Sequence, residues 1–151
     1  MQTERPRFNE TSQHRQLCDD IYQALPKKRS AFVVTIDGRD CAGKSTLARY
    51  LASQLQMTAL ELDVFRDLDQ SAFDFRLPDL QRAIQARTKR DRHVIVEGVT
   101  VGSVLRQISV VPDYKIFVDH DDPCLDPPPA KLRSYLVEYR PEEGVDFTFS
   151  W

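Results

Sequence analysis

The sequence predicts an α/β fold with a doubly wound, mostly parallel sheet of five strands. Short apolar segments alternate with segments of helical periodicity along most of the 151 residues, which is the pattern of repeated strand–helix units. Two of the apolar segments, 93–98 and 113–121, run without alternation, which indicates strands buried on both faces. A third segment, 31–37, leads directly into a glycine-containing loop and then into a helical pattern.

An amphipathic helix is expected before the first strand. Leu17, Ile21 and Leu25 recur at intervals of four after the capping residue types of 11–12, and Pro26 ends the segment. Pro78 fits the first turn of a later helix. In chain order, the expected strands are 31–37, 58–63, 93–98, 113–121 and 145–151, and the remaining helices follow residue 45, lie around 103–108 and span 130–139.

Residues 38–45 read GRDCAGKS, the G-x-x-x-x-G-K-[ST] pattern of a P-loop. Two glycines let the backbone turn tightly, so that successive N–H groups and the start of the next helix point at phosphate oxygens. The lysine then reaches the β and γ phosphates, and the serine hydroxyl is a ligand for Mg²⁺. The predicted nucleotide-binding residues are Gly38, Arg39, Asp40, Cys41, Ala42, Gly43, Lys44, Ser45 and Thr46.

One domain is the natural count for a chain of this length. Within 1–151 we expect an N-terminal helical region (1–29) and a nucleotide-binding core (30–121). A Pro-rich loop (122–129) and a C-terminal helix and strand (130–151) complete the expected domain.

Two acidic residues follow apolar strands and suggest phosphoryl transfer. Asp63 ends the second expected strand and Glu97 ends the third. Because the carboxyl ends of parallel strands converge on the ligand crevice, both are expected beside the P-loop. The reaction requires a base and a metal carboxylate. Other interpretations remain open, since Asp63 can cap a turn, Glu97 can be a loop carboxylate, and Asp119 offers a competing metal site.

Charge and composition exclude several other classes of partner. The net charge of −2 and the absence of a polybasic block argue against binding to nucleic acid or to a membrane surface. The first ten residues lack the apolar core of a signal peptide, so a cytoplasmic location is expected. Cys18, Cys41 and Cys124 form no C-x-x-C motif, which predicts reduced thiols and no zinc. The oligomeric state is left open.

A P-loop by itself does not distinguish GTPases, transport ATPases and small-molecule kinases. The only asparagine of the chain is Asn9, so the N-K-x-D motif with which GTPases read guanine is missing. An LSGGQ-like segment is missing as well. A small-molecule kinase remains.

Four segments resemble the uridine/cytidine kinase branch of P-loop nucleoside kinases, whose relatives include phosphoribulokinase and bacterial pantothenate kinase. VTIDGRDCAGKSTLA is similar to the strand and P-loop of that family, and LDVFRD is similar to its D-x-F-Y-R segment. VIVEG resembles its metal-site strand, and IFVDHD resembles the strand before its lid. A weaker similarity covers 135–151.

The resemblance implies an ATP-dependent kinase with Mg²⁺ that phosphorylates a hydroxyl of a small metabolite, a nucleoside first among the candidates. By the same resemblance Asp63 is the general base and Glu97 the carboxylate associated with Mg²⁺, while Lys44 acts on the phosphates. Phe65, Arg66 and Asp74 are the implied substrate contacts.

The chain departs from the family pattern after the IFVD strand. The family carries an Arg-rich lid helix there, whereas this chain reads DDPCLDPPPAKLR. Only Lys131, Arg133 and Arg140 supply positive charge nearby, and a positioned arginine contributes about 10³ to 10⁵ in rate to phosphoryl transfer. Three hypotheses therefore stand: a kinase, a non-catalytic, regulatory nucleotide-binding module, or a stand-alone ATPase or GTPase switch.

Overall fold

The centre of the sheet is the strand β1 (Val33–Gly38), which lies between β3 (Val94–Glu97) and β4 (Tyr114–Asp119). The computed structural model describes residues 8–69, 73–120 and 128–151. Within them β2 (Thr58–Glu61) and β5 (Phe147–Ser150) complete a five-stranded sheet of order β2-β3-β1-β4-β5. All four strand pairs are parallel, so the predicted sheet is confirmed and is parallel throughout.

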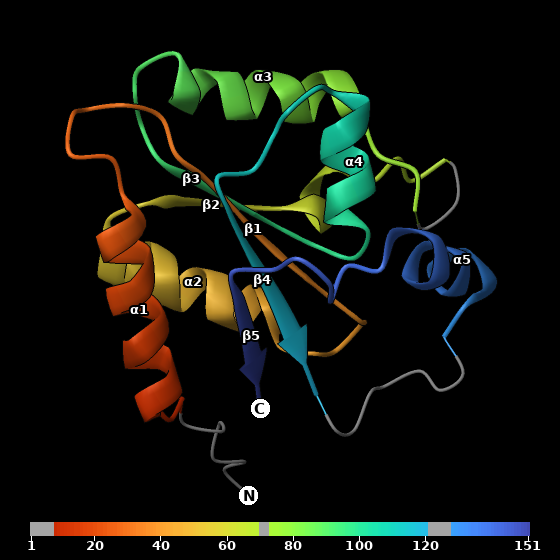
Figure 1. Ribbon diagram of the computed structural model, residues 1–151. Coiled ribbons are helices and arrows are strands. Elements are labelled where there is room, and N and C mark those ends of the chain that lie inside the picture. Colours follow the sequence, from red (N-terminus) through yellow and green to blue (C-terminus); the bar gives the residue numbers. More distant parts are fainter. Residues whose placement is uncertain (1–7, 70–72, 121–127) are drawn as a thin grey trace, which may run out of the picture.

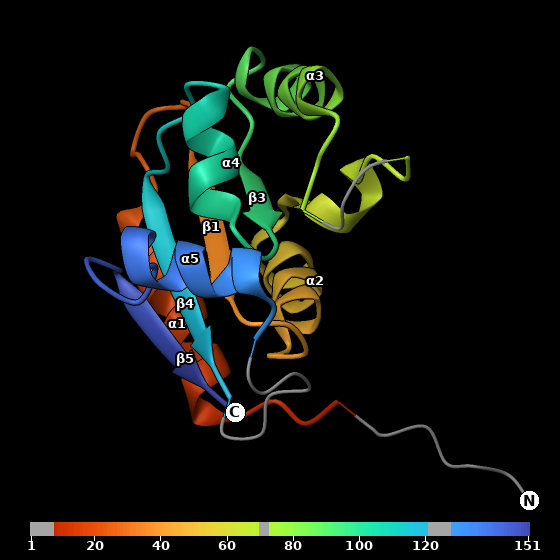
Figure 2. The same ribbon diagram turned by 90° about the vertical axis from the view of Figure 1, so that its right-hand side faces the viewer.

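Helices cover both faces of the sheet, as Figures 1 and 2 show. On one face α1 (Ser12–Ala24) and α2 (Lys44–Leu55) pack their apolar side chains against the sheet. The other face is covered by α3 (Leu77–Thr88), α4 (Val101–Gln107) and α5 (Ala130–Tyr139). A short 3-10 helix, η1 (Leu62–Phe65), follows β2 directly. The sequence-predicted helices lie within a few residues of these bounds.

Burial of the strands is uneven. Every residue of β1 and β3 is buried, which confirms the prediction from the continuously apolar segment 93–98. The same prediction is wrong for β4, where Lys115 and Asp119 are exposed. The second face of β4 is only partly covered by helices, because a cavity of about 460 Å³ opens between α4, β4 and α5. Runs of apolar residues therefore do not by themselves report burial on both faces.

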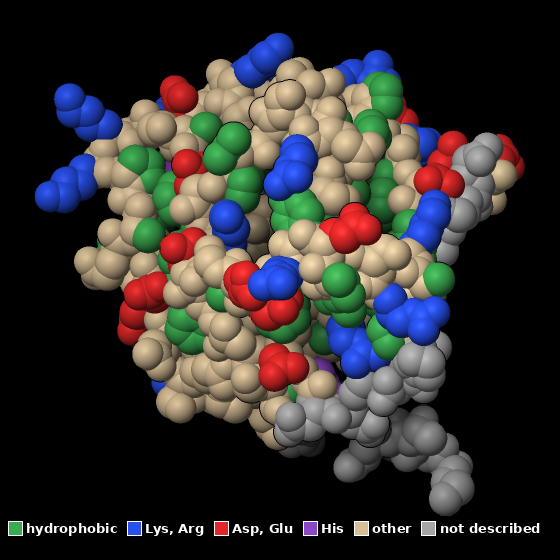
Figure 3. All heavy atoms as spheres, turned by 45° about the vertical axis from the view of Figure 1, so that its right-hand side comes forward, with side chains coloured by type: hydrophobic (Ala, Val, Ile, Leu, Met, Phe, Trp, Pro, Cys, Tyr) green, Lys and Arg blue, Asp and Glu red, His purple; other side chains and the backbone are tan. Residues whose placement is uncertain are grey.

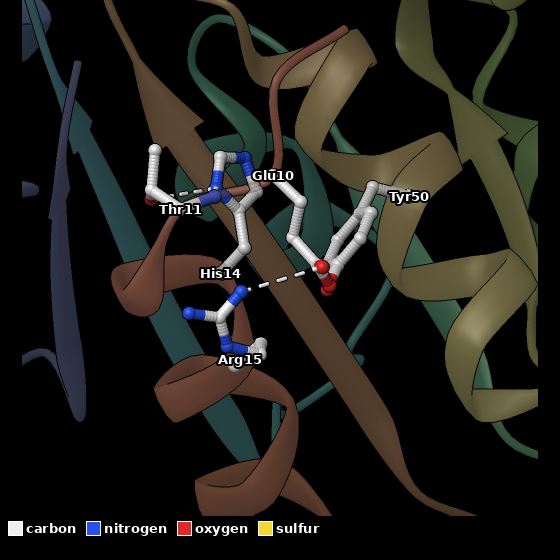
Figure 4. A network of polar contacts seen from close by, with 5 residues as sticks. All are labelled: Glu10, Thr11, His14, Arg15 and Tyr50. Carbon is white, nitrogen blue, oxygen red and sulfur yellow. Dashed lines mark hydrogen bonds and ion pairs between the residues drawn. The ribbon is translucent and has the colours of Figure 1, made fainter.

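The helix α1 is fixed against α2 by a polar and aromatic network (Figure 4). His14 is fully buried, and its Nδ1 accepts a hydrogen bond from the backbone N–H of Thr11 at 3.1 Å. Tyr50, on α2, donates its hydroxyl to Glu10, which also pairs with Arg15 at 3.5 Å. Desolvation lowers the pKa of His14, so its imidazole is neutral at physiological pH. This histidine is a structural residue.

Part of the predicted Pro-rich loop, residues 122–127, lies outside the described residues. Among those that the structure describes, no helix is long and apolar enough to cross a membrane.

Candidate active site

The P-loop connects the carboxyl end of β1 to the start of α2, as predicted. Its two glycines are required by different constraints. Gly38 has φ of 152°, and a Cβ there would lie 2.6 Å from the carbonyl oxygen of Val118 on the neighbouring strand. Gly43 caps α2 in the left-handed region, with φ of 87°. A side chain at either position would strain or displace the loop, so the backbone N–H groups keep their arrangement only with glycine.

Lys44 is buried, with 7% of its surface exposed, and its Nζ donates to the backbone carbonyl of Arg39 at 2.6 Å. Desolvation lowers the pKa of the ammonium group. Glu97, Asp40, Asp37 and Asp63 oppose that change by Coulomb attraction, in decreasing order. The lysine thus carries its charge at the centre of a group of carboxylates, the position from which a cation can neutralise phosphate oxygens.

Ser45 and Glu97 lie on facing elements and are hydrogen-bonded. The Ser45 Oγ donates to Glu97 Oε1 at 2.7 Å, and only 3% of Glu97 is exposed. Burial raises the pKa of the Glu97 carboxyl, while the Ser45 and Lys44 contacts lower it. A serine hydroxyl and one carboxylate fit Mg²⁺, which takes oxygen ligands and completes its octahedron with water and phosphate oxygens. Among the described residues no cluster of three or more acidic, His or Cys side chains offers a metal site made by protein alone.

Asp63 lies in the same hollow, although it does not end a strand. The strand β2 stops at Glu61, and Asp63 belongs to the 3-10 helix η1 that turns away from the sheet edge. Residues predicted to bind phosphate, to bind the metal and to act as the base line one cavity of about 270 Å³. It is lined by Asp40, Cys41, Gly43, Lys44, Ser45, Thr46, Asp63, Glu97, Gly98 and Val99. The expected convergence at the carboxyl edge is thus present in the geometry.

The three implied substrate residues do not line this cavity. Phe65 is half-buried and packs against the apolar core beneath α3. Arg66 forms an isolated antiparallel bridge with Phe75, so that 65–67 and 74–76 run antiparallel to each other. Asp74 forms an ion pair with Lys131 of α5 at 3.6 Å. This pair joins the segment after η1 to the helix that follows the Pro-rich loop.

Asp119, the competing metal carboxylate, is exposed and does not line the P-loop cavity. Its backbone carbonyl accepts a hydrogen bond from the N–H of Trp151 at 3.2 Å. Glu97, in contrast, lies within hydrogen-bonding distance of the Ser45 hydroxyl. The geometry therefore favours Glu97 over Asp119 as the metal-associated carboxylate.

Sequence reasoning missed a buried polar contact beneath the P-loop. Asp37 accepts hydrogen bonds from the Tyr135 hydroxyl and from the backbone N–H of Gly38, the latter at 2.8 Å. Burial raises the pKa of the Asp37 carboxyl to about 6, against the lowering effect of these hydrogen bonds and of Lys44. The contact fastens α5 to the root of the P-loop. No sequence signal predicts it, because 98 residues separate the two side chains.

A second missed residue is Trp151, which packs directly on the P-loop. A Cβ added at Gly43 would lie 2.4 Å from the indole Nε1. Trp151 as a whole is 39% exposed. Phe149 and His14 hold it from the other side, with ring centroids 5.0 Å and 5.4 Å away. An aromatic residue after the last strand gives no local hint of this position.

The cysteines differ from the expectation of reduced thiols. Cys18 is a free thiol, but Cys41 in the P-loop is disulfide-bonded. The remaining cysteine, Cys124, lies outside the described residues. Spacing could not predict a bridge at Cys41, because it does not reveal which distant segments leave the same edge of the sheet. Here Gly38 and Val118 pair in register, so the P-loop and the chain after β4 start side by side.

The predicted lid charges are not at the cavity. Arg140 pairs with Glu143 at 3.2 Å, and both line the separate cavity between α4, β4 and α5. Arg133 is exposed on α5 and lines neither cavity. Of the described arginines, none has a place in the lining of the P-loop cavity.

Several solved structures have a similar fold. A candidate uridine kinase from Bacillus stearothermophilus matches 91% of this chain and 97% of its own, with a TM-score of 0.62 and 17% identity. A candidate fructose transport system kinase from Silicibacter sp. TM1040 covers 90% of this chain and 85% of its own (TM-score 0.56, 20% identity). A sugar kinase from Janibacter sp. HTCC2649 covers 80% and 84% (TM-score 0.50, 17% identity).

No protein-family model matches the sequence, and a search of curated protein sequences finds no match. At these levels of identity the solved structures establish the fold. The chain has the α/β fold of P-loop kinases, and the predicted resemblance is confirmed at that level.

Proposed function

We propose that the chain is an ATP-dependent phosphotransferase that moves the γ-phosphate of ATP to a hydroxyl of a small metabolite. The observation that carries this proposal is the shared cavity in which Lys44, Asp63 and the Ser45–Glu97 pair meet. Phosphoryl transfer needs charge neutralisation and an oriented acceptor, and these residues supply both kinds of group. The kinase descriptions of the three similar structures support the same reading.

Each residue has a proposed role in the reaction. The P-loop N–H groups and Lys44 would hold the phosphates, and Ser45 with Glu97 would hold Mg²⁺, which when bound would supply positive charge beside the phosphate oxygens. Asp63 accepts the proton of the acceptor hydroxyl as the new P–O bond forms. Asp63 is exposed, so an acceptor can approach it from solvent.

For the acceptor we propose a hydroxylated metabolite of the nucleoside or sugar class. The similar structures include a candidate uridine kinase and a sugar kinase, and the segment 64–77 next to Asp63 is where these acceptors would be distinguished. We propose Phe65, Arg66 and Asp74 as the residues of that segment that shape the acceptor side. We also propose that residues 1–151 form a single domain.

The alternative is a nucleotide-binding module without catalysis. It is favoured by one observation: the cavity lining, among the described residues, contains no arginine to stabilise the transferring phosphoryl group.

Steady-state assays with Mg²⁺-ATP across nucleosides, pantothenate and sugars distinguish the two functions. A kinase forms ADP and a phosphorylated product in equal amounts, and Asp63→Asn lowers kcat by about 100-fold or more without weakening ATP binding. Asp69→Asn is the matched control, because that exposed carboxylate lies outside the cavity lining. ATP binding without any product from this panel would support the module instead.

A further inference from the structure

A second concentration of positive charge lies at the end of the sheet opposite the P-loop. We call it the basic cluster and define it as Lys27, Lys28, Arg29, Arg87, Lys89, Arg90 and Arg92. These are seven of the 21 Lys and Arg residues of a chain whose net charge is −2. In the sequence they form two separate runs, each of which reads as an ordinary solvated turn.

The fold brings the two runs together. The turn after α1 and the turn between α3 and β3 meet at the amino edge of the sheet (Figure 1), where an Arg29 Nη donates to the carbonyl of Arg90 at 3.4 Å. Between them lies an open hollow of about 630 Å³. Its lining consists of Arg29, Arg87, Arg90, Asp91 and Arg92, which places four guanidinium groups around a single carboxylate.

Among the described residues, the members of the basic cluster form no ion pair with a carboxylate, unlike several other charged residues of the surface. Several exposed arginines elsewhere are paired, as Arg49 is with Glu61 at 2.7 Å and Arg82 with Asp79 at 2.5 Å. The face shown in Figure 3 likewise carries Lys, Arg, Asp and Glu side chains interspersed.

Two buried polar atoms at this end of the sheet also lack hydrogen-bond partners within the described residues. They are the Nε of Arg87 and the Nδ1 of the neighbouring His93. Burial, together with the positive charge of Arg87, lowers the pKa of His93. Like charges held together destabilise the folded chain, and planar guanidinium groups match phosphate oxygens in a two-pronged geometry.

We propose that the basic cluster binds a compact anion that carries two or more phosphate groups. Several unpaired guanidinium groups facing one hollow suit more than one phosphate, whereas a single carboxylate would leave most of them unpaired. The site is separate from the P-loop, because the six residues of β1 place roughly 20 Å between the two edges of the sheet. One small anion therefore cannot occupy both sites.

Calorimetric titration of inorganic tripolyphosphate into the Lys44→Ala chain tests the site while the P-loop is weakened. We expect binding that falls about 100-fold when Arg90→Gln and Arg92→Gln are added, roughly tenfold for each charge-assisted contact. The matched control adds Arg15→Gln and Arg82→Gln, which removes two arginines already paired with carboxylates. This control should change affinity by no more than about twofold.

Thermal unfolding provides a second measurement. Tripolyphosphate should raise the Tm of the Lys44→Ala chain, and the added Arg90→Gln/Arg92→Gln pair should abolish that rise while leaving the ligand-free Tm equal or higher. Absence of binding at low salt, or binding that survives both substitutions, would overturn the proposal. Binding of a long RNA without binding of tripolyphosphate would overturn it as well, since the surface would then recognise a polymer.

Two sources of such an anion are distinguished with vesicles. Co-sedimentation with phosphatidylcholine vesicles that contain a bisphosphorylated inositol lipid, lost in Arg90→Gln/Arg92→Gln, assigns the site to a lipid headgroup. Tripolyphosphate binding without co-sedimentation assigns it to a soluble phosphate compound. Either result supports the site.

Discussion

The two edges of the sheet gather positive charge in opposite ways. At the carboxyl edge one buried lysine, Lys44, is surrounded by carboxylates, and the loop around it presents backbone N–H groups. At the amino edge the basic cluster exposes several cations around Asp91 alone. The first arrangement is balanced in charge and shaped by backbone geometry, whereas the second is unbalanced and made of side chains.

This difference determines how each edge would bind phosphate. A buried site lined by backbone N–H groups fixes the position of a phosphate, and salt screens its electrostatic interactions little. A set of exposed charged side chains fixes the position of a phosphate less closely, and salt screens its interactions strongly. The proposed phosphoryl transfer belongs at the carboxyl edge, because the proposed base and the proposed metal ligands line one cavity there with the P-loop. The amino edge offers binding without chemistry.

The largest effect on turnover is expected from a substitution at the carboxyl edge, compared with substitutions at the amino edge. Lys44→Ala should lower kcat by about 10³ or more, because the charge that neutralises the transferring phosphate is lost. Arg90→Gln/Arg92→Gln should leave turnover within about twofold of the wild type, since neither residue is near the cavity. A coupled ATP-to-ADP assay measures both. Loss of turnover in the arginine variant would show that the edges are not independent.

A pH effect is expected at the carboxyl edge, where burial raises the pKa of Asp37 to about 6, above the ordinary value of 3.8 for this group. The folded chain binds this proton more tightly than the unfolded chain. Its contribution to stability is therefore complete below about pH 4 and is lost as the pH rises through 6, a change of about 3 kcal/mol. Asp37→Asn should remove it.

Urea unfolding of the wild type and Asp37→Asn at pH 4.5 and pH 7 measures this difference. Other carboxylates affect both chains alike, so the difference between the chains isolates Asp37. Parallel pH profiles for the two chains would contradict the assignment. Tyr135→Phe is a companion variant, which removes the hydroxyl donor and should raise the Asp37 pKa further.

Gly43→Ala should weaken ATP binding by about tenfold, because Ala is strained at a φ of 87° and its Cβ would meet the Trp151 indole. Adding Trp151→Ala relieves the contact but not the strain, so binding should recover in part. Equilibrium dialysis with ATP measures the four chains of this double-mutant cycle. Full recovery would show that the indole alone requires glycine here.

The smallest effect expected is a difference in salt dependence. Raising ionic strength from about 0.05 to 0.2 M should weaken tripolyphosphate binding at the basic cluster by about tenfold and ATP binding at the P-loop by much less. The fluorescence of Trp151, the only tryptophan, follows the P-loop site because the indole touches Gly43. Equal salt slopes at the two sites would remove the distinction between them.

Much of the fold followed from local patterns. The P-loop motif, the strand before it and the helix after it lie within about 25 residues, so their spacing reports their structure directly. The strands at 58–61, 94–97 and 114–119 and the helix at 130–139 were also predicted by periodicity. The parallel arrangement then placed Asp63 and Glu97 at the same edge, although a 3-10 helix carries Asp63.

The acceptor side could not be predicted in the same way. The segment 64–77 has no periodicity, and its described residues are positioned by the Arg66–Phe75 bridge and by the ion pair of Asp74 with Lys131. Contacts of this kind join residues far apart in sequence through irregular backbone. Local propensity carries little information about them.

By itself, the sequence determined the strand–loop–helix unit that carries the P-loop motif and the order of the secondary-structure elements, because these depend on neighbouring residues. Tertiary structure decided the contacts between distant segments: Tyr135 on Asp37, Trp151 on Gly43, and the two runs that form the basic cluster. Such contacts depend on the order of strands in the sheet and on which turns share an edge. Periodicity along a single chain does not encode that order.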